Sequence, residues 1–162
     1  MQIPGGRFSR WRSVAGVFVA ISIVVFICSL GESTYRTDWP GEPHGSCFVL
    51  LLIGWLGVLG GIWAWLANPA LLGAWISVWS RRTRPLALLC SLAALGFALT
   101  FLGQKEMDVD EAGNHAKIIS YGAGYWVWIA SIGVMILGCT WLCIRDWLGL
   151  ADIACDRHDA FQ

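Results

Sequence analysis

The chain is divided into four long apolar blocks, at residues 14–30, 47–66, 85–102 and 125–144. None of them contains Asp, Glu, Lys or Arg, and the charged residues gather in the segments between the blocks. A helix crosses the bilayer core with about 20 consecutive apolar residues and satisfies its backbone hydrogen bonds internally. The pattern therefore predicts an all-α, polytopic membrane protein: a bundle of four transmembrane helices forming a single membrane domain over residues 1–162.

A shorter apolar element lies between the second and third blocks. Asn68-Pro69 predicts a helix break, because proline lacks an N–H and disfavours a helical conformation in the residue before it. Asn68 is suited to cap the next helix and Pro69 to begin it. Large apolar residues then recur at helical spacing: Leu71, Leu72, Trp75, Ile76 and Trp79. We expect a short interfacial amphipathic helix over about 69–80, and the alternative is a longer second span that continues through Pro69.

Arginine is concentrated in two segments that flank the blocks. These arginines are Arg7, Arg10, Arg12, Arg81, Arg82 and Arg84. Lys and Arg in short loops favour the cytoplasmic side, whereas the first and third connecting segments are mainly acidic. Four spans then return the tail, residues 145–162, to the cytoplasm. The sequence predicts a multi-pass protein of the bacterial inner membrane with both termini cytoplasmic. The first block exceeds the about 7–15 apolar residues of a signal peptide, so we expect it to remain in the mature protein.

The composition supports a membrane protein. Of the 162 residues, 57% are hydrophobic and only 14% are charged, which leaves no segment long enough for a separate soluble core. The formal net charge is zero, which gives no reason to expect a nucleic-acid partner. Most of the 11 tryptophans lie near predicted span ends, as in the aromatic belts of membrane proteins. An aromatic ligand cage or quinone site is the alternative interpretation.

The second block carries a glycine-rich face formed by Gly54, Gly57, Gly60 and Gly61. Small residues let helix backbones approach closely in lipid, where no hydrophobic force drives helices together. Counterpart small residues occur in the other blocks: Gly16, Ala20, Ala87, Ser91, Ala94, Ala98, Gly133 and Gly138. We expect this face to pack within the bundle, and homodimerisation through it is the alternative.

No residue set in the sequence indicates catalysis, a metal or a cofactor. The apolar blocks hold no ionisable residue of the kind that marks proton-coupled transport, and the three histidines lie outside them, where they could not ligate a haem in the bundle. No Ser, His and Asp set shares one predicted membrane face, and there is no glycine-rich phosphate loop. We therefore expect a protein that is not an enzyme. Cys28 and Cys47 fall near the outer ends of adjacent predicted spans, where a disulfide could join them.

Two short motifs carry a resemblance to known sequences. They are Trp65-Leu66-Ala67-Asn68-Pro69 and Tyr121-Gly122-Ala123-Gly124-Tyr125-x-x-Trp128. In these motifs the chain resembles small uncharacterised bacterial four-span inner-membrane proteins, over about its last three spans. The resemblance implies a topology and no activity.

The leading functional hypothesis is a non-enzymatic membrane protein that binds another membrane protein or a membrane-active toxin. An immunity-type protein against a pore-forming toxin is its most specific form. The first alternative is a small permease or channel with a hydroxyl-lined path, formed by Ser22, Ser91, Thr100, Ser131 and Thr140. The second is an enzyme acting on lipid or quinone with polar residues at the outer surface, namely Asp108, Asp110, Glu111 and His115.

Overall fold

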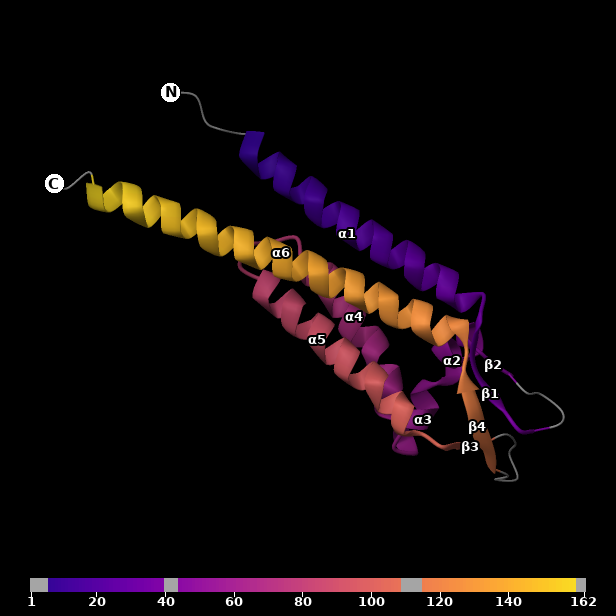
Figure 1. Ribbon diagram of the computed structural model, residues 1–162. Coiled ribbons are helices and arrows are strands. Elements are labelled where there is room, and N and C mark those ends of the chain that lie inside the picture. Colours follow the sequence, from indigo (N-terminus) through magenta and orange to yellow (C-terminus); the bar gives the residue numbers. More distant parts are fainter. Residues whose placement is uncertain (1–5, 40–43, 109–114, 160–162) are drawn as a thin grey trace.

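The computed structural model describes the backbone of residues 6–39, 44–108 and 115–159, and the side chains of residues 14–39, 45–107 and 115–149. The elements in chain order are α1 (Gly6–Leu30), β1 (Ser33–Thr37), β2 (His44–Ser46), α2 (Cys47–Ile53), α3 (Trp55–Leu59), the 3-10 helix η1 (Trp63–Leu66), α4 (Ala67–Ser77), α5 (Arg84–Thr100), the 3-10 helix η2 (Phe101–Gly103), β3 (Glu106–Asp108), β4 (His115–Tyr121) and α6 (Ala123–Asp159). The molecule is mostly helical, with a small sheet at one end (Figure 1).

The helices α1, α4, α5 and α6 form an elongated bundle. α1 runs alongside α6, α5 packs on α6, and α4 packs along α5 (Figure 1). Because successive long helices run in opposite directions, the first turns of α1 and the last turns of α6 share one end of the bundle (Figure 1). The turn at residues 78–83 lies at this same end of the bundle, which we call the basic end because the turn carries Arg81 and Arg82. The sheet lies at the opposite end.

α5 has small residues on its buried face and leucines on its exposed face. Ala87, Ser91, Ala94 and Ala98 are all fully buried, which confirms their prediction as a packing face. The opposite face exposes Leu86, Leu89, Leu92 and Leu99. Large apolar side chains that point outward around small buried ones are typical of helices that pack in lipid.

Two helical segments have the length and composition of membrane spans, Arg84–Gly103 and Ala123–Gly149. They contain the predicted blocks 85–102 and 125–144. The first block is also helical, within α1, but its apolar part Val14–Leu30 is shorter. The prediction of long apolar helices is therefore confirmed at two of the four positions.

The second predicted span, residues 47–66, is wrong as a continuous helix. The chain forms α2, turns at Gly54, forms α3, turns again at Gly60 and Gly61, and then enters η1. Gly61 has a φ of +88°, a backbone conformation that glycine adopts readily and L side chains rarely do. The four glycines of this block therefore do not form one face of a helix, because they include both turns.

The predicted interfacial helix is a member of the bundle. α4 follows η1 directly, so the helix break lies before η1 rather than at Asn68-Pro69. The N-cap of α4 is Leu66 rather than Asn68. Pro69 lies in the first turn of α4, where a missing N–H is tolerated. Leu71 and Ala74 are fully buried in the main core. Trp75 points into the bundle, where its Nε1 donates to Ser22 Oγ at 3.0 Å.

The sheet corrects the expectation of an all-α fold. It has four antiparallel strands in the order β2-β1-β4-β3. The central pair, β1 and β4, joins the segment after α1 to the segment before α6. Tyr35 of β1 is paired with Tyr121 of β4, so residues far apart in the sequence lie opposite each other. The sheet therefore ties the end of α1 to the start of α6 and lies over the ends of the helices.

Candidate functional site: a cavity beneath the sheet

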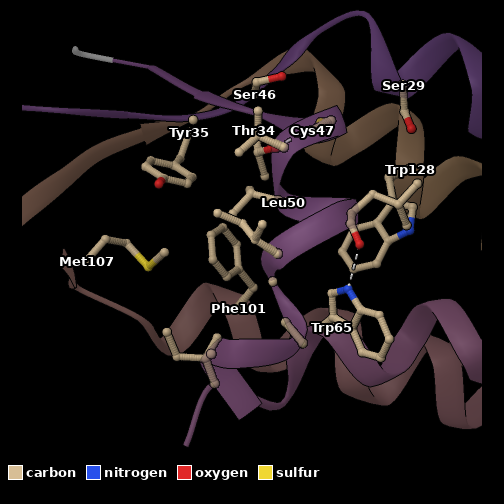
Figure 2. Close-up of a pocket in the computed structure, with 18 of the residues that line it drawn as sticks. Ser29, Thr34, Tyr35, Ser46, Cys47, Leu50, Trp65, Phe101, Met107 and Trp128 are labelled. Carbon is tan, nitrogen blue, oxygen red and sulfur yellow. Dashed lines mark hydrogen bonds between the residues drawn. The ribbon is translucent and has the colours of Figure 1, made fainter. Parts of the chain in front are cut away.

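A cavity of about 650 Å³ lies at the sheet end of the molecule. β1 and the start of α2 form its upper wall, and Trp65 of η1 and Phe101 of η2 lie below (Figure 2). Its lining comprises Phe26, Ser29, Leu30, Thr34, Tyr35, Thr37, Trp39, Gly45, Ser46, Cys47, Val49, Leu50, Leu51, Ile53, Gly54, Gly57, Ile62, Ala64, Trp65, Asn68, Phe101, Met107 and Trp128. Ligand cavities in proteins commonly measure about 300–1,000 Å³ and are mainly apolar, so this one has the size of a small-molecule site.

β1 contributes three of the lining residues, Thr34, Tyr35 and Thr37. A regular strand alternates its side chains between two faces, so Thr34 would point away from the face that carries Tyr35 and Thr37. The pairing of β1 is irregular on both edges, with a register shift toward β2 between Ser33 and Tyr35 and one toward β4 between Arg36 and Thr37. Bulges redirect side chains and are common beside functional sites. The extra residue of β1 is Thr34, which explains how it joins Tyr35 and Thr37, two residues of the same strand face, in the lining.

The side wall is the segment formed by α2, α3 and η1. Neither α2 nor α3 has a buried residue. Trp65 holds this segment together, because its indole Nε1 donates to the carbonyl of Leu51 at 3.0 Å (Figure 2). Gly54 allows the close approach, since a Cβ at this position would lie 2.8 Å from Trp65 Cδ1. The wall is thus a thin, hydrogen-bonded layer rather than a packed helix.

Aromatic residues at the helix ends form the rest of the site. The Tyr121 hydroxyl donates to backbone carbonyls after α5, with Leu102 O nearest at 3.1 Å, and the Tyr125 hydroxyl donates to Ala98 O at 3.0 Å. Phe101 packs against both of these rings. This cluster fixes the position of Phe101, which borders the cavity.

The two sequence motifs meet at the cavity. Trp128 Nε1 donates to Asn68 Oδ1 at 3.1 Å, which joins the first motif to the second. Trp65, Asn68 and Trp128 all line the cavity. Gly124 of the second motif lies against Cys47 Sγ and the Ser33 carbonyl, where a side chain would clash. The motifs are therefore parts of one site rather than separate features of two helices.

Among the described residues, the lining includes no Asp, Glu, Lys, Arg or His. Burial raises the pKa of the Tyr35 hydroxyl. Burial also raises the pKa of the Cys47 thiol, an effect that Glu32 reinforces and the hydrogen bond with Thr34, at 2.8 Å, opposes. Both groups are therefore neutral near pH 7. Over the described residues, no group of three His, Cys, Asp or Glu side chains could hold a metal ion. The site suits a neutral, largely apolar molecule.

The structure separates the other predicted site residues. Gly54 and Gly57 line the cavity, whereas Gly60 and Gly61 lie in the turn after α3. Cys28 and Cys47 are both free cysteines, so the disulfide that could have joined them is not formed in this structure. Trp79 is exposed at the basic end, with its ring 3.7 Å from the Cβ that Gly16 would carry.

The predicted topology-setting residues lie away from the cavity. Arg81 and Arg84 bind Asp146, while Arg82 is exposed. The side chains of Arg7, Arg10 and Arg12 lie outside the described part of the molecule.

None of the described side chains assigned to the two alternative functions lines the cavity. Ser22, Ser91 and Ser131 are buried in the bundle and each donates to a backbone carbonyl, at 2.7–2.9 Å. Thr100 is exposed and donates to Phe97 O, and Thr140 is half-buried on α6. Of the acidic loop, Asp110 and Glu111 lie outside the described residues, and Asp108 is described in its backbone alone.

Sequence reasoning missed Thr34, Tyr35, Thr37, Phe101 and Met107. The signal for the first three was present, because Ser33-Thr34-Tyr35-Arg36-Thr37 is rich in the β-branched and aromatic residues of strands. Phe101 and Met107 carried no distinguishing local signal. No protein-family model, curated protein or solved structure matches the chain.

Proposed function

We propose that this chain is an integral membrane protein that binds a neutral, lipid-soluble small molecule in the cavity beneath its sheet. The cavity itself is the observation that supports this function. It combines a volume of about 650 Å³ with an apolar, aromatic lining and a few polar groups, which is the usual composition of a small-molecule site.

The surface of the bundle supports a location in lipid. Large apolar side chains are exposed on all four long helices, for example Val24 on α1, Ile76 on α4, Leu89 on α5 and Leu137 on α6. Soluble proteins rarely expose continuous apolar surface on this scale. In our proposal the protein is multi-pass in a bacterial inner membrane, and the basic end faces the cytoplasm, as expected from the distribution of Lys and Arg.

The location of the cavity favours a ligand that comes from the membrane. Its side wall, α2 and α3, exposes Leu52, Trp55, Leu56 and Leu59 on its outer surface. A lipid-soluble molecule would meet an apolar surface on both sides of this wall, so its transfer from the bilayer into the cavity crosses no polar layer.

A photolabelling experiment tests the proposal. The protein is reconstituted in phosphatidylcholine nanodiscs and labelled with a diazirine analogue of dodecane. We expect saturable labelling of cavity residues such as Met107. Leu50→Trp should weaken it, because Leu50 lines the cavity and the larger ring takes up part of its volume. The control is Leu52→Trp on the same helix, since Leu52 is 57% exposed and is not part of the lining. Labelling that never saturates, or that Leu50→Trp leaves unchanged, would refute the function.

A second candidate is binding of a protein partner at the sheet end, in its most specific form immunity to a pore-forming toxin. The sheet favours it, because β2 and β3 are the edge strands over the described residues and an edge can pair with a strand of another chain. Ile119 on β4 also exposes 67% of its surface there. Cells expressing the chain alone would be challenged with a panel of pore-forming toxins, and unchanged survival throughout would eliminate this candidate.

A further inference from the structure

Thr37 is a buried side chain whose polar atom has no partner. It is only 5% exposed. Among the buried side-chain nitrogen and oxygen atoms of the described residues, Thr37 Oγ1 alone makes no hydrogen bond. Leaving a buried hydroxyl unsatisfied is unfavourable, so such a group needs an explanation.

Several other polar side chains of the lining already have hydrogen bonds. Thr34 Oγ1 is paired with Cys47 Sγ at 2.8 Å, and Ser29 Oγ donates to the carbonyl of Phe26 at 2.6 Å. Asn68 Oδ1 accepts the Trp128 indole N–H, and Trp65 donates to a backbone carbonyl. Thr37 therefore differs from these neighbours, because it lines the cavity and its hydroxyl has no partner within the protein.

The position of Thr37 follows from the alternation of side chains along β1. The register shift between Arg36 and Thr37 skips Ile119 of β4, so β1 itself has no extra residue between Tyr35 and Thr37. Thr37 lies two residues after Tyr35, which places both residues on the same face of the strand. Both of them line the cavity.

We infer that the ligand is an uncharged, mainly hydrocarbon molecule with one hydroxyl or carbonyl oxygen, and that Thr37 Oγ1 is the group that recognises this oxygen. The inference rests on the proposed function of the cavity. A charged head group is disfavoured, because the described lining residues offer no charged side chain to balance it and an unpaired buried charge is strongly unfavourable. A plain hydrocarbon would leave the Thr37 hydroxyl unsatisfied.

Three matched probes test this specificity in the same nanodiscs. Dodecan-1-ol, dodecane and dodecanoate compete with the diazirine analogue for the saturable site. We expect dodecan-1-ol to compete best and dodecanoate to compete least. Thr37→Val removes the hydroxyl with little change in shape, and it should weaken binding of dodecan-1-ol roughly two- to tenfold, as expected for one hydrogen bond. Binding of dodecane should not change.

Two further variants separate recognition from a structural effect. Thr37→Ser keeps the hydroxyl and should keep the preference for the alcohol. Thr34→Val removes a lining hydroxyl that is already paired, and it should also leave the preference intact. Equal binding of dodecan-1-ol and dodecane by the unmodified protein, tightest binding of dodecanoate, or an unchanged alcohol preference in Thr37→Val would each overturn the inference. Absence of saturable labelling in the unmodified protein would instead refute the function of the cavity.

Discussion

Replacing Asp146 with alanine tests whether a buried ion pair holds the basic end of the bundle together. Asp146 on α6 binds two arginines near the start of α5. Arg84 Nη1 lies 2.7 Å from Asp146 Oδ2, and the Arg84 side chain is only 3% exposed. Arg81 Nε lies 2.9 Å from Oδ1, but its side chain is 49% exposed. One carboxylate therefore holds two arginines in very different surroundings.

The two contacts should differ widely in their contribution to stability. Asp146→Ala leaves the Arg84 guanidinium buried without its counter-ion, and the loss of one partner of a buried pair costs about 3–5 kcal/mol. We expect about 3 kcal/mol, because Arg84 Nε keeps a long hydrogen bond to Val78 O at 3.4 Å. Arg81→Ala removes only the half-exposed contact, which should cost about 0–1 kcal/mol.

The free energy of unfolding is measured by SDS titration in mixed micelles, with tryptophan fluorescence as the signal. A double variant provides the sharpest comparison. Arg84→Met combined with Asp146→Ala removes both the buried charge and its partner, so it should be more stable than Asp146→Ala alone. If the double variant were less stable than the single one, or if Asp146→Ala cost no more than Arg81→Ala, the buried charge would not be the source of the effect.

Three other predictions address packing, the cavity and topology. Gly138→Ala should destabilise the protein by about 1–3 kcal/mol in the same titration, because its Cβ would overlap the Phe18 ring; an unchanged stability would contradict the observed α1–α6 contact. Alkylation of Cys47 by iodoacetamide should accelerate only above the ordinary thiol range, and Thr34→Val should shift the pKa of Cys47 further upward by removing the hydrogen bond that lowers it; an unchanged or lower pKa would show that the bond has no such effect. A cysteine at the exposed Ile119, in a variant without other cysteines, should react with an impermeant maleimide added outside intact cells; labelling only after lysis would reverse the proposed orientation.

The helices of the bundle could be predicted where helical periodicity and apolar length agree. The segments containing residues 85–102 and 125–144 are long apolar helices, and the small face of α5 is buried as expected. These predictions depend on local properties, because each residue's side of the helix follows from its position in the turn. The packing of small residues against neighbouring helices then follows without further information.

The second block could not be interpreted from composition alone. Glycine at four-residue spacing is typical both of a close helix crossing and of turns, and apolar content does not distinguish the two. The difference is decided by tertiary contacts. Trp65 donates to Leu51 O across the block, and Ile62 fills the space beside Gly57, which stabilises a folded-back segment over a straight helix.

The cavity could be predicted only in part. The motifs around Asn68 and Trp128 were visible in the sequence, but their hydrogen bond joins two helices across the bundle. β1 and β4 pair residues as distant as Tyr35 and Tyr121, and strands this short give weak periodic signals. Which hydroxyl is left without a partner depends on tertiary packing, and no local pattern reveals that.

The location of the cavity follows from how the rest of the chain packs. Along the bundle, inward-facing alanines and serines such as Ala87, Ser91 and Ala94 bring the helix backbones close together, and such packing leaves little free volume. Free volume arises where the chain leaves helical order, between the bulged strand β1 and the folded-back segment α2–α3. The unsatisfied Thr37 hydroxyl occurs at that same end. Substitutions that straighten either segment should therefore close the cavity while leaving the bundle intact, which makes binding and stability separable in this protein.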